Sequence, residues 1–282
     1  MLGFGPLSQQ PFSAQPAAAT STAGILVVQS ATAFTANYVT SSTIAPAAAV
    51  AAGNFLLLWI STSAAAANNV TGVTDINNNT WVKVGSDRQG GRTGDWWYVQ
   101  SAAGGTPTIT ITSTNFITRA IVLRELSGVA SATPIDVFAY ALVAASLTPT
   151  ATATTTNAND LIVGAAGIDK SATVYTLGAG YSNLSQANGA DFLSAAMESK
   201  LVTSTGLQTA NFTIDSPQGG IMGIIAIKAA AGGAAPVGST GRIKVYNGTA
   251  FVAKPVKVWN GTAWVVKPVK RWNGTLWVVT PY

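Results

Sequence analysis

Short apolar runs alternate with small polar turns along residues 24–228. The runs are rich in β-branched and aromatic side chains and are bounded by Gly, Asn, Asp and Ser, a pattern typical of β-strands. Sustained helical periodicity is missing, so the pattern predicts an all-β body. The expected strands are Ile25–Val28, Phe55–Ile60, Trp81–Val84, Trp96–Val99, Thr108–Thr112, Ala120–Leu126, Leu161–Ala165, Met197–Val202, Asn211–Ile214 and Ile221–Ile227.

The strand pattern of the body occurs twice. Phe55–Trp59 and Leu161–Ala165 follow similar polar pairs, and the later strands of the two halves recur in the same order at an offset of 101 to 106 residues. Two similar halves packed face to face would form a β-sandwich. We therefore predict a jelly-roll-like β-sandwich over residues 24–228.

Residues 242–282 contain a 13-residue repeat. Asn-Gly-Thr follows Tyr246, Trp259 and Trp272, and a second aromatic residue comes two positions after each Thr: Phe251, Trp264 and Trp277. Asn-Gly between alternating hydrophobic residues is the strongest short-range signal for a hairpin with a two-residue turn. Such a turn places Trp259 opposite Thr262 and Lys257 opposite Trp264. We therefore predict an array of three β-hairpins that bends at Pro255, Pro268 and Pro281, because proline cannot donate to a central ladder.

Two segments flank the body. Residues 1–23 contain three prolines and show no periodicity, which fits either an unstructured terminus or an extended anchor peptide whose apolar side chains dock on another subunit. The candidate anchor residues are Leu2, Phe4, Leu7 and Phe12. Residues 229–241 are rich in Gly and Ala, and they predict a flexible linker between the body and the hairpins.

Composition removes several classes of chemistry. The chain of 282 residues has no His and no Cys, and 9% of its residues are charged. A Ser-His-Asp triad, imidazole or thiolate metal sites and disulfides are thereby excluded. The longest apolar runs are far shorter than the roughly 18 residues of a membrane-spanning helix, so we expect no membrane insertion. Residues 1–240 carry 8 basic and 10 acidic residues, whereas the remainder carries 7 basic residues and no acidic one.

The acidic residues offer only weak candidates for chemistry. Glu125 and Glu198 are the only glutamates, and we expect them and the aspartates to lie at the surface or in turns. Asp75–Asn79 resembles the start of a calcium loop, but its sixth position is Thr80 and its twelfth is Ser86. We interpret it as a polar turn, and we predict no catalytic residue, metal site or cofactor.

The hairpins carry the candidate binding residues. The Trp and Lys side chains could pack as structure, stack on sugar rings, or bind nucleic acid, which the sparse basic residues make the least favoured of the three. The candidate glycan or assembly face consists of Trp259, Trp264, Trp272, Trp277, Lys257 and Lys270.

These residues resemble a known class of protein. The opening MLGFGPL, the pattern from GNFLLLWIS to IVLRELSGV, and the WNGTAWVVKPVK repeats are similar to virion accessory proteins of tailed bacteriophages and related gene-transfer particles, of the fibre, spike or tail type. The resemblance implies a non-enzymatic, oligomeric protein of the virion, assembled in the cytoplasm of the host bacterium. Its implied partners are other virion proteins, further copies of the chain and host surface polysaccharide.

Two other functions stay open at this point. One is a bacterial surface or secreted carbohydrate-binding module, which would use the same Trp and Lys face. The other is an enzyme of the carboxylate type acting on polysaccharide, which would need two acidic side chains about 5–9.5 Å apart.

Overall fold

The computed structural model describes residues 24–63, 69–89, 91–189 and 192–230, together with 242–246, 251–255, 257–259, 261–266, 270–272 and 277–279. Its contacts divide the chain into two units, and the larger one, Thr22–Ala231, is the body. The described residues form strands and turns without any helix, so the all-β prediction is confirmed. The candidate anchor residues and most of the expected linker lie outside the described residues.

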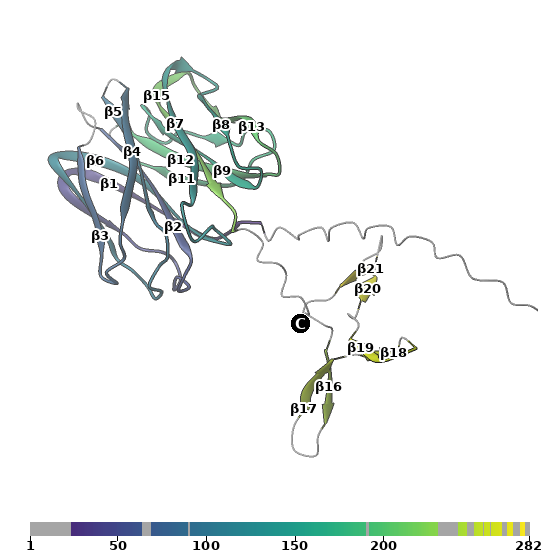
Figure 1. Cartoon of the computed structure of the whole chain (residues 1–282). Coiled ribbons are helices and arrows are strands. Elements are labelled where there is room, and N and C mark those ends of the chain that lie inside the picture. The colour runs from purple at the N-terminus through teal and green to yellow at the C-terminus, as the bar shows by residue number, and fades with distance from the viewer. Residues whose placement is uncertain are drawn as a thin grey trace, which may run out of the picture. The chain divides into compact units, whose positions relative to one another are not determined.

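The described residues of the body form fifteen strands, most of which are labelled in Figure 1. The first half contains β1 (Leu26–Ile44), β2 (Phe55–Thr62), β3 (Val70–Asp75), β4 (Val82–Gln89), β5 (Arg92–Val99) and β6 (Ile109–Ser127). The second half contains β7 (Ile135–Ser146), β8 (Thr150–Thr155), β9 (Asp160–Ile168), β10 (Tyr175–Thr176), β11 (Ser182–Asn188), β12 (Ser194–Val202), β13 (Gly206–Asn211), β14 (Thr213–Ile214) and β15 (Gln218–Lys228).

The two halves have the same antiparallel topology. One large sheet has the order β1-β6-β2-β5-β4, and the other has the order β7-β15-β9-β12-β11. In the second half, β8 pairs with β13, and β10 pairs with β14. The corresponding pairs of the first half are the end of β1 with β6, and β3 with β6. β13 and β14 count here as one strand, and β1 and β6 as two strands each, because both pass from one layer to the next. Each half then has one five-stranded and one three-stranded layer, as in a β-sandwich. The predicted duplication is confirmed at the level of topology.

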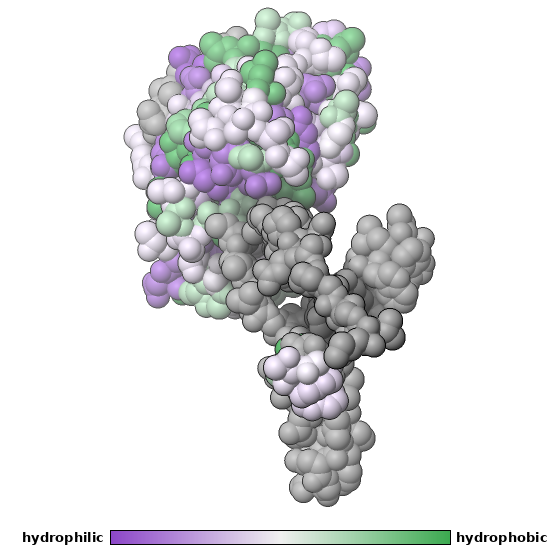
Figure 2. Space-filling model, turned by 45° about the vertical axis from the view of Figure 1, so that its right-hand side comes forward, coloured by the Kyte–Doolittle hydropathy of each residue, from purple (hydrophilic) through white to green (hydrophobic). Residues whose placement is uncertain are grey.

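The two large sheets pack face to face around a shared core. Alternate residues of β2 and β9, such as Phe55, Leu57, Leu161 and Val163, meet in this core, while the residues between them face an outer cluster on each side. Every residue of β2 and β9 is therefore buried, which explains their continuous apolar sequence. On the face of the body shown in Figure 2, hydrophobic and hydrophilic residues are interspersed in small patches.

The body has a proximal end and a distal end. The proximal end is where the chain enters and leaves: Gly24 packs against Gly128, and the amide of Ala230 donates to the carbonyl of Gly128 (2.7 Å). The distal end lies at the opposite ends of the strands, where β4 turns into β5 and β11 turns into β12. Arg92, at the start of β5, lies at this distal end.

The C-terminal unit contains three hairpins. They are formed by β16 (Arg242–Tyr246) with β17 (Phe251–Pro255), β18 (Lys257–Trp259) with β19 (Trp264–Val266), and β20 (Lys270–Trp272) with β21 (Trp277–Val279). The predicted array of three hairpins is therefore present. In each hairpin the two strands pair with each other.

Candidate functional site

The hairpin turns are longer than the Asn-Gly signal predicts. Trp259 pairs with Trp264, so four residues, 260–263, connect the strands instead of two. The expected pairing of Trp259 with Thr262 is wrong by two positions. Gly261 has a φ of 98°, which only glycine adopts readily. The two-residue shift conserves the side on which each residue lies, because side chains alternate with a period of two.

This register brings the aromatic residues of each repeat together. Trp272 pairs with Trp277, and Tyr246 pairs with Phe251, as Trp259 pairs with Trp264. The rings of Trp259 and Trp264 have centroids 5.8 Å apart and are tilted by 59°. Trp259 is 51% exposed and Trp264 is 65% exposed. An aromatic pair with most of its surface in water stabilises the hairpin and leaves ring surface for a ligand.

The two candidate lysines hold equivalent places in their repeats. Lys257 pairs with Val266, and Lys270 pairs with Val279. The expected position of Lys257 opposite Trp264 is therefore wrong, because Trp264 pairs with Trp259.

Four carboxylates are buried, contrary to the expectation of surface positions. They are Asp95, Glu125, Asp160 and Glu198, each at most 1% exposed. They do not form one cleft: Asp95 and Glu125 pair with Ile60 and Leu56, near opposite ends of β2, whereas Glu198 and Asp160 belong to the other large sheet. Asp95 forms an ion pair with Lys83 (2.8 Å). Burial raises the pKa of Asp95 above its usual value, although Lys83 opposes the shift.

The nearest approach to an acid pair is Asp136 with Asp160. Burial, with the neighbouring charge of Asp136, raises the pKa of Asp160 to about 6. The two oxygens of Asp136 accept hydrogen bonds from Thr156, and one also accepts from the amide of Asn157. Asp160 accepts a bond from the side chain of Asn157 (2.7 Å). These contacts hold the turn between β8 and β9, which gives both carboxylates a structural role.

The Asp75 loop is likewise held by its own residues. The Asp75 carboxylate accepts hydrogen bonds from the amides of Asn77 and Asn79 and from the side chains of Asn79 and Trp81. Asn78 has a left-handed φ of 56°, which Asn tolerates in turns. The interpretation as a polar turn between β3 and β4 is confirmed. Within the part of the chain that the structure describes, no three Asp or Glu side chains gather as a metal site would require.

Two grooves lie at the seams between the large sheets, and sequence reasoning missed both. One, of 460 Å³, lies between β4 and β7; its lining residues are Val82, Lys83, Val84, Tyr98, Ile135, Asp136, Val137 and Phe138. The other, of 290 Å³, is lined by the start of β1 and by residues of β11 and β12, including Ser182, Asn183 and Lys200. The internal repeat relates the two grooves, since β1 corresponds to β7 and β11 to β4.

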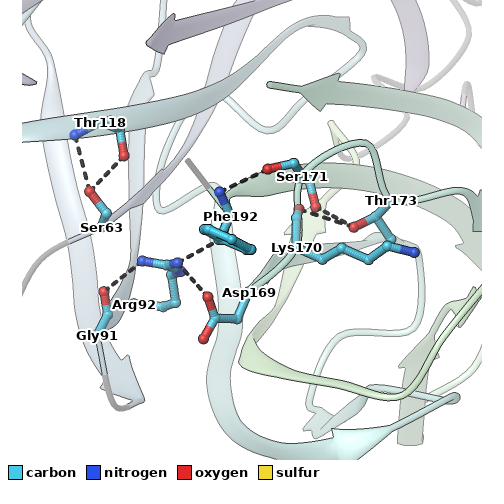
Figure 3. A network of polar contacts seen from close by, with 10 residues as sticks. Ser63, Gly91, Arg92, Thr118, Asp169, Lys170, Ser171, Thr173 and Phe192 are labelled. Atoms are coloured by element: carbon cyan, nitrogen blue, oxygen red, sulfur yellow. Dashed lines mark hydrogen bonds and ion pairs between the residues drawn. The ribbon is translucent and has the colours of Figure 1, made fainter. Parts of the chain in front are cut away.

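A polar network closes the distal end of the body (Figure 3). Arg92 of β5 forms an ion pair with Asp169 and donates to the carbonyl oxygen of Phe192 (2.7 Å). Asp169 follows β9 and Phe192 precedes β12, so Arg92 connects the two halves. Lys170 forms an ion pair with Asp215 (2.5 Å) in the same region. The sequence contains a weak signal for this place, because Asn-Gly before Phe192 is typical of a hairpin turn.

Comparisons with known proteins gave no relative of this chain. No family model, no curated protein and no solved structure matches it. Among the described residues, no helix of a length and apolarity suited to crossing a bilayer occurs.

Proposed function

We propose that this chain is a structural protein of a virion surface, a component of a fibre, spike, collar or tail. In this proposal residues 1–23 attach the chain to the particle, the β-sandwich body forms a rigid unit, and the hairpins contact the host surface or neighbouring copies. The sequence resemblance to phage accessory proteins supports the class of protein. The buried acidic residues, each held by structural contacts, fit a protein that works by binding.

The observation that carries the proposal is the repetition of an aromatic pair on three successive hairpins in one register. A single aromatic pair binds weakly, but three such pairs on one chain, two of Trp and one of Tyr with Phe, gain avidity from their high effective concentration, and the copies on a particle multiply the effect. Such repetition favours a contact with a repeating surface, such as a polysaccharide or an array of identical subunits.

The proposal is tested on purified particles. We expect mass spectrometry to find the chain in particles from the strain that encodes it, and antibodies against the body to label those particles in electron micrographs. Deleting residues 1–23 should leave a folded chain that no longer joins the particle. Its absence from purified particles would refute the proposal.

The second candidate is a surface or secreted carbohydrate-binding module, and the exposed Trp259–Trp264 pair favours it. We expect a Trp264→Ala, Trp277→Ala double variant to lose binding on a glycan array while its body unfolds at the wild-type temperature. Trp264→Phe, Trp277→Phe is the matched control, because it keeps an aromatic ring at both positions. Equal binding by the Ala variant would exclude the hairpins as the sugar-binding face.

A further inference from the structure

Phe192 at the distal end combines two unfavourable features in one residue. Its φ is 52°, in the left-handed region that bulky side chains rarely adopt. It is also 71% exposed, the highest exposure among the large hydrophobic residues of the described chain. Gly or Asn at this position would avoid both the backbone strain and the exposure of a ring to water.

The fold holds this unfavourable conformation from both sides. The amide of Phe192 donates to Ser171 Oγ (2.8 Å), and its carbonyl oxygen accepts from Arg92 Nη2 (2.7 Å). Arg92 is fixed in turn by Asp169, and its own side chain is largely buried. The two halves of the body therefore both position one exposed ring. Strained residues that their surroundings hold in this way are concentrated at ligand-binding sites.

The surroundings of the ring are polar and electrically balanced. Figure 3 shows Phe192 with Arg92, Asp169, Lys170 and Ser171 around it. Beside the ring, the Arg92 guanidinium is paired with the Asp169 carboxylate. The Lys170 ammonium points away from the ring in Figure 3 and is paired with Asp215. The side chain of Asp169 remains 50% exposed, so its carboxylate is accessible to hydroxyl groups of a ligand.

We propose that the distal end is a binding site for a neutral carbohydrate, with Phe192 as the platform on which a sugar ring stacks. A flat ring fits the C–H face of a pyranose, while the carboxylate, guanidinium and hydroxyl groups of Asp169, Arg92 and Ser171 beside it suit the sugar hydroxyls. A protein partner would favour an interface core depleted of charged residues, whereas here the Arg92–Asp169 ion pair adjoins the ring. A polyanion would favour an excess of positive charge, which a guanidinium already paired with a carboxylate does not supply.

This site is separate from the hairpins and does not depend on the particle. It adds a contact on the body, at the end opposite to Gly24 and Ala230. It would serve either of the two functions proposed above.

The test uses the full-length chain on an array of neutral and acidic polysaccharides, with affinities for the retained sugar measured by calorimetry. Phe192→Asn keeps a residue that tolerates the left-handed conformation and removes the ring. We expect this variant to bind the neutral polysaccharide at least about tenfold more weakly, and to unfold at the same or a higher temperature, because backbone strain and an exposed ring are both removed.

Two controls separate this site from the other proposals. Leu207→Ser removes an equally exposed apolar side chain from β13, and it should bind as the wild type does. The Trp264→Ala, Trp277→Ala variant should still bind the neutral polysaccharide through Phe192, which is the binding that Phe192→Asn loses. The proposal is overturned if the wild type retains only acidic polysaccharides or none, if Phe192→Asn binds normally, or if Phe192→Asn changes only the oligomeric state.

Discussion

Glu125 and Glu198 show how tertiary contacts separate two identical side chains. The carboxylate of Glu198 accepts hydrogen bonds from the amides of Gly178 (2.9 Å) and Asn211 (3.2 Å). Burial nevertheless raises its pKa to about 7. Burial by itself would also raise the pKa of Glu125. Hydrogen bonds from the side chains of Gln29 and Asn54 and from the amide of Ala51 outweigh this effect, so the pKa of Glu125 is lowered. One glutamate therefore weakens the fold when ionised, and the other strengthens it.

The two residues predict opposite pH dependences of stability. The pKa of Glu198 is higher in the folded than in the unfolded chain. Its contribution to the stability of the fold is therefore fully present below about pH 4.5 and is lost as the pH rises through about 7. In urea unfolding at a series of pH values, the wild type should lose on the order of 2 kcal/mol relative to Glu198→Gln between pH 4.5 and 8.

Glu125→Gln is the matched control with the opposite sign. The folded pKa of Glu125 is lowered, so its contribution is present above the unfolded pKa and is lost as pH falls through the folded one. The free energy of unfolding that Glu125→Gln loses relative to the wild type should therefore become smaller as the pH falls. Parallel pH curves for the wild type and both variants would contradict this account.

At the scale of elements, the two halves have diverged to fit each other. Trp59 of β2 and Trp96 of β5 fill the centre of the shared core, with ring centroids 4.7 Å apart. Trp59 reaches across to donate to the carbonyl of Ala166 in β9 (3.1 Å). The facing strand β15 provides Gly223, where a Cβ atom would lie 2.6 Å from Trp96 Nε1. Large residues in one half thus require small ones in the other.

This fit predicts the effect of a single methyl group. Gly223→Ala should lower the free energy of unfolding by about 1–3 kcal/mol, because the indole rings of Trp59 and Trp96 have no free space into which to move. Equilibrium unfolding in urea measures the change. Gly91→Ala is the control, since a Cβ there meets no atom within 4 Å. Equal stability of the two variants would show that the core adapts to the added group.

At the scale of the whole molecule, the body and the hairpins differ in what supports them. The body buries three hydrophobic clusters of its own. Each hairpin has two strands, and β18 and β19 contain three residues each. Hairpins of that size are marginally stable in water unless one face is covered. We therefore infer that the hairpins pack on other copies of the chain through the side opposite to Trp259 and Trp264.

Truncation tests this inference. We expect the full chain to form an oligomer and a 1–240 fragment to dissociate to fewer chains per assembly, as measured by light scattering. The fragment should unfold at nearly the same temperature as the body of the full chain, because β1 to β15 and all three clusters are retained. The same number of chains in both proteins would remove the hairpins as the assembling element.

Local patterns in the sequence determined several features of this protein by themselves. Alternation, β-branched runs and turn residues placed the ten expected runs in or at strands, although Thr108–Thr112 and Ala120–Leu126 belong to the single strand β6, and β7, β8, β10 and β11 were not expected. Similar strands at an offset of 101 to 106 residues revealed the duplication. Asn-Gly-Thr between aromatic residues located the three hairpins. These features depend on neighbours within a few positions, or on repetition, and both can be read along one dimension.

Only the tertiary structure decided which strands meet and what that does to single side chains. β1 and β6 are each 19 residues long, and they bend from one layer to the next through register shifts between Thr35 and Ser41 that no local signal marks. The burial of Glu198, the strained exposure of Phe192 and the two seam grooves arise from residues far apart in the chain. Long-range packing sets the solvent and the partners of each group, and the amino-acid pattern around that group contains neither.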